Sequence, residues 1–266
     1  MTDNDTVSLN HVLEGPEGAP VLVFSNSLGT SLRMWDEQAA ALVEHFRLLR
    51  YDHRGHGRSS VPPGPYKIDD LGRDLLALLD HLEIERAAFC GLSLGGMVGM
   101  WLASHAPERV SHLVLCCTSA RLGPPENWTS RAKTVREEGL GAVAEASMER
   151  WFTPMLRESR PGVLRWAERM LLDTPVEGYA GCCEAMRDMD LTGSLGDIQA
   201  PTLVVAGADD PVTPPDHAKL IVGSIPGARL TVVGNAAHLA NVEQPEKVTR
   251  EMLEHLVPMT GSGGIR

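Results

Sequence analysis

Long apolar runs and a basic leader are both missing from this sequence of 266 residues. No uninterrupted apolar stretch approaches the ~20 residues that a helix needs to cross a bilayer. The first ten residues, MTDNDTVSLN, are acidic and polar, whereas a secretory signal begins with basic residues and continues with apolar ones. We therefore expect a cytoplasmic protein that has no membrane partner.

Cysteine is scarce, and its spacing fits neither a metal site nor a redox pair. The five cysteines are Cys90 and two adjacent pairs, Cys116-Cys117 and Cys182-Cys183. None of them shows the C-x-x-C spacing that is typical of zinc sites and thiol–disulfide enzymes. Free cysteine in an apolar run behaves as a small hydrophobic residue. We expect five reduced thiols, and the sequence indicates no metal and no other cofactor.

Positive charge is also in short supply. The chain has 24 Lys and Arg against 35 Asp and Glu, which gives a net charge of −11. Nucleic acids and anionic membranes require a basic face, so neither is expected as a partner. An anionic small substrate would need a local cationic group. The sequence is compatible with a homo-oligomer but does not specify one.

Apolar runs of strand length alternate with longer amphipathic stretches over most of the chain. Their periodicity predicts strands at 21–25, 46–52, 86–91, 110–117, 201–207 and 228–234. It predicts helices at 35–45, 68–82, 94–105, 215–223 and 242–256. This alternation is typical of an α/β fold with a mostly parallel central sheet and helices on both faces.

Residues 121–195 interrupt this alternation, because their segments are helical in period and contain no strand-like run. The expected helices there are 130–138, 140–151, 160–172 and 177–189. We predict a core made of 1–120 and 196–258, with 121–195 inserted as a helical lid over the carboxyl ends of the strands, where open α/β sheets bind ligands. The glycine-rich end, 259–266, is expected to be a flexible tail or the start of a linker.

Ser93 lies in the stretch FCGLSLGG, with Gly91 and Gly95 two residues away on either side. A predicted strand precedes it and a predicted helix follows it. In that setting the pattern G-x-S-x-G is typical of a tight turn that exposes a nucleophilic serine. The alternative is a serine without a catalytic role in a glycine-rich bend. The context favours Ser93 as a nucleophile.

A serine hydroxyl needs a base to take its proton, and that base is usually a histidine oriented by a carboxylate. Of the ten histidines, His238 lies in the loop directly after the last predicted strand. The stretch GADDPVTP follows strand 201–207 and offers Asp209 and Asp210 as the acid. We favour Asp210, from its spacing to the surrounding glycine and proline, and interpret Asp209 as a solvated loop residue.

The order Ser, Asp, His along the chain, with the serine on such a turn, resembles the α/β-hydrolase fold family over essentially the whole chain. The stretch DHRGHGRS (52–59) matches a turn of that family, in which Arg54 and the glycines are expected to hold loop structure. The resemblance implies an oxyanion hole with two backbone N–H donors. These would be Leu94 and, from the loop after strand 21–25, Leu28, although this chain has Asn26-Ser27 where many relatives have His-Gly.

A narrower resemblance rests on SNSLGTSLRMW (25–35), CGLSLGG, WFTP (151–154) and EGYAGCCEA (177–185). These stretches look like the 3-oxoadipate enol-lactonases of protocatechuate and catechol breakdown. The resemblance implies a small anionic lactone as substrate, opened through an acyl-enzyme. We expect Trp128 and Trp151 to line the substrate pocket and Arg131 to receive the substrate carboxylate.

Other functions share part of this pattern. A general carboxylesterase, or a hydrolase of another small ester or lactone, would use the same three residues. A binding protein of this fold would be expected to lack one of them. Dehalogenases of this fold use an aspartate nucleophile and epoxide hydrolases usually do, so Ser93 argues against both. Perhydrolysis as a side reaction stays open.

Overall fold

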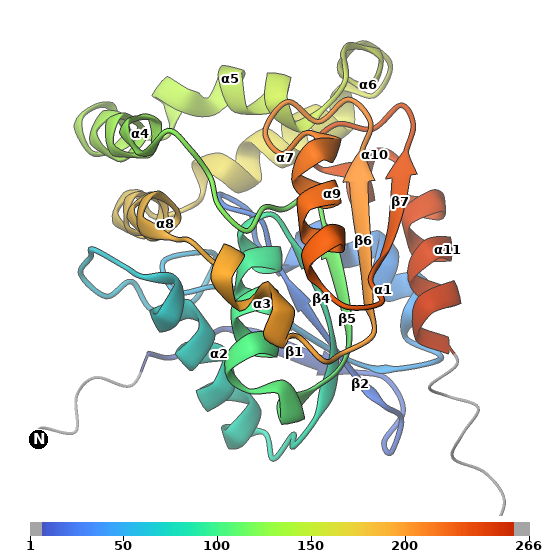
Figure 1. Ribbon diagram of the computed structural model, residues 1–266. Coiled ribbons are helices and arrows are strands. Elements are labelled where there is room, and N and C mark those ends of the chain that lie inside the picture. The colour runs from blue at the N-terminus through green and yellow to red at the C-terminus, as the bar shows by residue number, and fades with distance from the viewer. Residues whose placement is uncertain (1–6, 258–266) are drawn as a thin grey trace, which may run out of the picture.

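A seven-stranded sheet with strand order β1-β3-β2-β4-β5-β6-β7 forms the centre of the protein, whose computed structural model describes residues 7–257 (Figure 1). The tail expected at 259–266 lies outside the described residues. β1 pairs antiparallel with β3, and the other strand pairs are parallel. The strands are β1 His11–Glu14, β2 Val21–Ser25, β3 Arg47–Tyr51, β4 Ala87–Leu92, β5 Val110–Cys116, β6 Thr202–Gly207 and β7 Arg229–Val233.

Helices cover both faces of the sheet, as the alternating sequence pattern predicts. α2 (Ile68–His81), α3 (Leu94–His105) and α9 (Pro215–Ser224) lie on one face, and α1 (Asp36–Leu42) and α11 (Pro245–Leu256) on the other (Figure 1). This arrangement confirms the predicted α/β class with a mostly parallel sheet. Within residues 7–257, no helix combines the length and the apolar character needed to cross a membrane.

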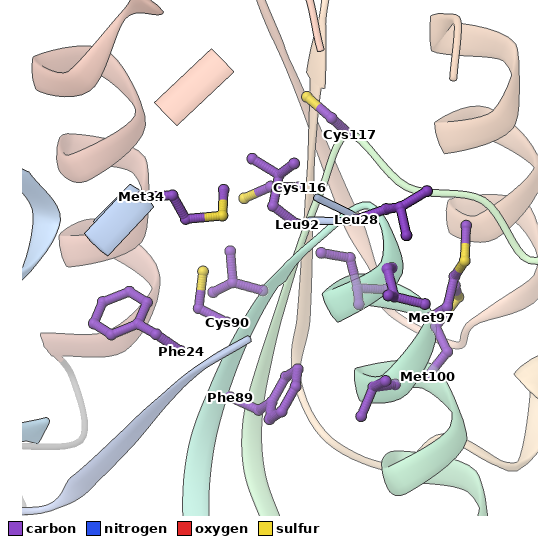
Figure 2. Packing of buried hydrophobic residues seen from close by; sticks show 14 of the residues in the cluster. Phe24, Leu28, Met34, Phe89, Cys90, Leu92, Met97, Met100, Cys116 and Cys117 are labelled. Carbon is purple, nitrogen blue, oxygen red and sulfur yellow. The ribbon is translucent and has the colours of Figure 1, made fainter. Parts of the chain in front are cut away.

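The core shows why the central strands are apolar on both faces. Phe24 of β2 and Cys90 of β4 are register partners and point away from α3, whereas Phe89 points toward it (Figure 2). Met97 and Met100 of α3 fill the α3 side of the sheet. Successive residues of a strand alternate between faces, so a strand buried on both sides must be apolar throughout. All five cysteines are buried and unbridged.

Between β5 and β6 the chain forms five α-helices that lie beyond the carboxyl ends of the strands (Figure 1). These helices are α4 Pro125–Glu138, α5 Gly141–Trp151, α6 Pro154–Ser159, α7 Pro161–Leu172 and α8 Val176–Asp188. Four of them match the expected helical segments, and α6 was not expected because only six residues separate its flanking prolines. We refer to residues 121–195 as the helical insertion.

Two expectations about the core elements were wrong in detail. The apolar pattern predicts no strand before residue 21, but β1 forms at the edge of the sheet, where its residues are mostly only partly buried. The helix expected at 242–256 is divided into α10 (Ala240–Glu243) and α11 by Gln244, whose φ of −128° and ψ of 58° are not helical. Pro245 follows directly, and a residue before proline is biased away from the helical conformation.

Candidate active site

Ser93 occupies the turn between β4 and α3, with φ of 56° and ψ of −115°. Such a backbone conformation costs a residue other than glycine about 1–3 kcal/mol and persists only where its surroundings fix it. The Ser93 N–H donates to the Cys116 carbonyl at 3.0 Å, and the Ser93 carbonyl accepts from Thr118 Oγ1 at 2.7 Å. The strained turn is therefore fixed by hydrogen bonds to β5 and to the loop that follows it.

The glycines around Ser93 are required by close backbone approach. A Cβ atom on Gly91 would collide with the Gly95 carbonyl, and one on Gly95 would collide with the Ser25 carbonyl. Both obstacles are backbone atoms, so they cannot rotate away. The pattern G-x-S-x-G is thus explained by packing of the turn against β2 and α3.

His238 and Asp210 meet at the carboxyl ends of β7 and β6. His238 Nδ1 lies 2.9 Å from Asp210 Oδ2, and both residues are buried. The other Asp210 oxygen accepts from the N–H groups of Val212 and Thr213, at 2.8 and 3.1 Å. Asp209 is exposed and makes no hydrogen bond or ion pair with His238. Of the two candidate acids, the fold brings Asp210 to the histidine.

Several effects act on the ionisation of Asp210. Burial alone would raise the pKa of Asp210, but attraction to His238 and hydrogen bonds from His238 and Thr213 outweigh it, so the pKa lies below its usual value. Asp210 therefore stays a carboxylate and can accept only from a protonated Nδ1. This arrangement leaves Nε2 of a neutral His238 as a proton acceptor toward the cavity.

The backbone N–H groups of Leu28 and Leu94, on either side of the site next to Ser93, have no acceptor within residues 7–257. Leu94 is the first residue of α3, where an N–H has no partner in its own helix. In the loop after β2, the N–H of Ser27 donates to Met34 Sδ at 3.2 Å and that of Gly29 donates to His56 Nε2 at 3.0 Å. The loop is held on both sides of Leu28, whose own N–H stays free for a ligand.

The stretch 52–59 holds the loop after β2 in place through hydrogen bonds. His53 Nε2 lies 3.0 Å from the Asn26 carbonyl, and Arg54 forms a double hydrogen bond with Asp74 at 2.5 and 2.6 Å. Burial lowers the pKa of His53 to about 3 and that of His56 to about 4. Both imidazoles are therefore neutral near pH 7 and serve as hydrogen-bonding parts of the loop, in agreement with the structural role expected for this stretch.

Replacing His56 by glutamine is expected to flatten the dependence of stability on pH. Because the pKa of His56 falls from 6.5 to about 4 on folding, the native state binds fewer protons than the unfolded state between these values. The stability from neutral His56 is complete above pH 6.5 and falls as the pH drops toward 4, by about 3 kcal/mol.

Denaturant unfolding of wild type and His56→Gln between pH 7.5 and pH 4 measures the pH-dependent part of the stability that His56 contributes. The variant keeps an acceptor for the Gly29 N–H but does not titrate, so its unfolding free energy should depend less on pH. An exposed control, His81→Gln, should follow wild type. Identical slopes for wild type and His56→Gln would show that His56 does not contribute.

A cavity of about 50 Å³ brings the candidate residues together. Its lining from the core consists of Ser27, Leu28, Ser93, Val212 and His238. Its lining from the helical insertion consists of Trp128, Arg131, Arg150, Trp151, Tyr179 and Met186. The residues expected from sequence as nucleophile, base and substrate contacts, together with the expected donor Leu28, thus share one cavity. Asp210 lies behind His238, and Leu94 follows Ser93 directly.

The cavity is lined by a second arginine, Arg150, in addition to Arg131, which the sequence indicated. Arg131 donates from Nε to the Tyr179 hydroxyl at 2.6 Å and from Nη2 to Ser147 Oγ at 2.8 Å. Arg150 also lines the cavity, and burial together with the charge of Arg131 lowers its pKa. Among residues 7–257, neither arginine has a carboxylate within 4.0 Å. Two unpaired cations in an acidic protein favour a ligand that carries a carboxylate.

Arg150 and Tyr179 were missed because their roles depend on packing between α4, α5 and α8. Arg150 directly precedes Trp151, but adjacent residues of a helix point in different directions, so sequence alone did not place both on one cavity. Tyr179 lies in the EGYAGCCEA stretch that carried the resemblance, and that position was its only signal.

The chain is similar to known proteins over most of its length. The family described as alpha/beta hydrolase fold matches residues 20–245. The chain is 45% identical over 240 residues to 3-oxoadipate enol-lactonase 2 of Acinetobacter baylyi, covering 90% of each chain. It is similar to the crystal structure of an enol-lactonase from Burkholderia xenovorans, with 42% identity, a TM-score of 0.93 and coverage of 95% and 98%. A hydrolase structure from Pseudomonas aeruginosa shows 49% identity, a TM-score of 0.92 and coverage of 96% and 97%.

Proposed function

This chain belongs to the α/β-hydrolase fold family, and on that basis we propose that it hydrolyses 3-oxoadipate enol-lactone to 3-oxoadipate, with Ser93, His238 and Asp210 as the catalytic triad. The observation that carries the proposal is the cavity in which Ser93 and His238 face two arginines without anionic partners. The names of the similar enol-lactonases support the choice of lactone.

The proposed reaction begins at the ring carbonyl of the lactone. Nε2 of His238 takes the Ser93 proton while the serine oxygen forms a bond to the carbonyl carbon. The resulting oxyanion accepts hydrogen bonds from the N–H groups of Leu28 and Leu94, each worth about 3 kcal/mol of barrier. Because both donors are fixed by the fold before substrate binds, they need no reorganisation during the reaction.

Collapse of this intermediate breaks the ring bond to the enol oxygen. The enol takes the proton from His238 and becomes a ketone on tautomerising. An enolate leaves more readily than an alkoxide, so the demand on protonated His238 as an acid is modest in this half. Water activated by His238 then attacks the acyl-enzyme, and Ser93 recovers its proton. The products balance as one lactone plus one water giving 3-oxoadipate.

The substrate carboxylate would bind at Arg131 and Arg150, with Trp128 and Trp151 as the apolar walls of the pocket. The helical insertion, 121–195, would then act as a lid, because it supplies both the cations and the walls. Closing such a lid excludes water and strengthens electrostatic contacts inside the site. The small cavity volume of about 50 Å³ fits a closed lid that opens to admit substrate.

Removing the charge of Arg131 is expected to raise KM for the enol-lactone. The variant Arg131→Met loses a charge-assisted contact to the substrate carboxylate, which corresponds to about a 10- to 100-fold rise in KM. Steady-state kinetics on p-nitrophenyl acetate, which has no carboxylate, should show little change in KM.

The matched control is Arg187→Met, because Arg187 of α8 is already paired with Asp188 at 2.6 Å. This control should keep the wild-type KM for the lactone. An unchanged KM in Arg131→Met would remove Arg131 from the carboxylate site and leave Arg150 as the candidate.

The function itself is tested by comparing two substrates on the purified protein. Loss of the ultraviolet absorbance of the enol-lactone should occur with a far higher kcat/KM than release of p-nitrophenol from p-nitrophenyl acetate. The opposite ranking would favour the alternative, a carboxylesterase or a hydrolase of another small ester or lactone that uses the same triad.

A further inference from the structure

Glu243 is a buried carboxylate that has no cationic partner among residues 7–257. It lies at the end of α10, and only 6% of its surface is exposed. Its oxygens accept from the Ala237 N–H at 2.8 Å, from the Thr153 N–H at 3.1 Å and, through a short contact, from the Thr153 hydroxyl. A buried charge is costly unless hydrogen bonds replace its water, so these donors account for its presence.

The donors come from the two segments that meet at the candidate active site. Ala237 directly precedes His238, and Thr153 belongs to the link between α5 and α6. A second contact joins the same segments, because the N–H of Leu239 donates to the Trp151 carbonyl at 3.0 Å. The residues on both sides of His238 are therefore tied to the part of the insertion that carries Trp151.

A cavity lies beside this junction. This cavity, of about 370 Å³, is lined by Thr153 and Ala237 together with Phe152, Met155, Asp209 and Asn235. Met155 of α6 is 57% exposed, whereas Phe152 and Thr153, which link α5 to α6, are buried. Beside this cavity, the hydrogen bonds of Glu243 to Thr153 and Ala237 join the two segments.

We propose that Glu243 is a positioning residue that couples the closed position of the helical insertion to the orientation of His238. This inference rests on the proposed role of His238 as the base. With Thr153 in place, Glu243 has all its donors and holds Ala237, which fixes the backbone from which His238 reaches Asp210. When the insertion lifts, the carboxylate loses the Thr153 donors and the Leu239 N–H loses the Trp151 carbonyl, so the backbone on both sides of His238 loses its ties to the insertion. His238 is therefore aligned only while the site is closed.

The test compares Thr153→Val, which lacks the hydroxyl, with Thr153→Ser, which retains it, and adds Glu243→Gln. We expect kcat to fall about 10- to 100-fold in Thr153→Val and Glu243→Gln with little change in KM, because misplacing a catalytic group by about 1 Å has effects of this size. Thr153→Ser should restore kcat to within about threefold of wild type.

A spectroscopic readout separates positioning from a general loss of stability. The proton between His238 Nδ1 and Asp210 should give a downfield NMR signal in wild type, and that signal should shift or broaden in Thr153→Val and Glu243→Gln. The matched control is Thr231→Val, which removes a similar Thr–Glu hydrogen bond, to Glu251 at 2.8 Å, between β7 and α11. It should lower the melting temperature without changing kcat or the NMR signal.

The inference is overturned if Thr153→Val and Glu243→Gln keep the wild-type kcat and the wild-type NMR signal, or if only KM changes. If Glu243→Gln does not fold, the comparison of Thr153→Val with Thr153→Ser still tests the proposal. The NMR signal can be measured without any substrate, and kcat can be measured on p-nitrophenyl acetate, which does not depend on binding of the lactone. Failure of the wild type to hydrolyse the enol-lactone would therefore reject the proposed substrate while the role of Glu243 is still measured.

Discussion

Replacing Ser93 by alanine is expected to lower kcat for the enol-lactone by about 10⁵- to 10⁶-fold, the scale on which loss of a serine nucleophile acts. The oxyanion donors Leu28 and Leu94 and the arginines would remain, so substrate should still bind. The fold should persist as well, because alanine removes one hydroxyl and the backbone bonds of Ser93 to Cys116 and Thr118 are kept.

The measurement is the loss of lactone absorbance at high enzyme concentration, with melting temperature as the check on folding. Ser104→Ala, near the far end of α3, is a suitable control and should keep wild-type activity. Turnover by Ser93→Ala above about one per cent of wild type would show that another group attacks the substrate, and the triad would have to be abandoned.

Replacing Asp210 by asparagine is expected to lower kcat by about 10⁴-fold, because the amide no longer fixes the tautomer of His238 or stabilises its protonated form. The neighbouring variant, Asp209→Asn, provides the matched control, since Asp209 is exposed and does not contact the histidine. Its kcat should stay within about threefold of wild type. The reverse order of these two losses would assign the acid to Asp209 and contradict the observed contact.

Much of the fold was readable from the sequence because strand and helix periodicity differ. The run VLVFS at 21–25 and the run TLVVAG within 201–207 are apolar on both faces, as buried parallel strands must be. Ser93, Asp210 and His238 each follow a strand of that sheet. Since the carboxyl ends of parallel strands lie at one edge, their positions in the sequence already predicted that they would lie close together.

Other parts of the site depend on contacts between distant segments, which periodicity does not report. Glu243 reads as an ordinary helix residue, yet it receives hydrogen bonds from Thr153, 90 positions earlier in the chain. Arg150 was missed because its side-chain direction depends on how α5 packs against α4. β1 was missed because an edge strand is only partly buried and carries a weak apolar signal.

The most direct test of the account is the mass of the enzyme during its first turnover of the enol-lactone. Rapid acid quenching followed by peptide mass analysis should find the peptide that contains Ser93 heavier by the whole mass of the lactone, because ring opening releases no fragment. A first turnover completed with the enzyme unmodified, or with the added mass on a peptide without Ser93, would contradict nucleophilic attack by Ser93 on this substrate.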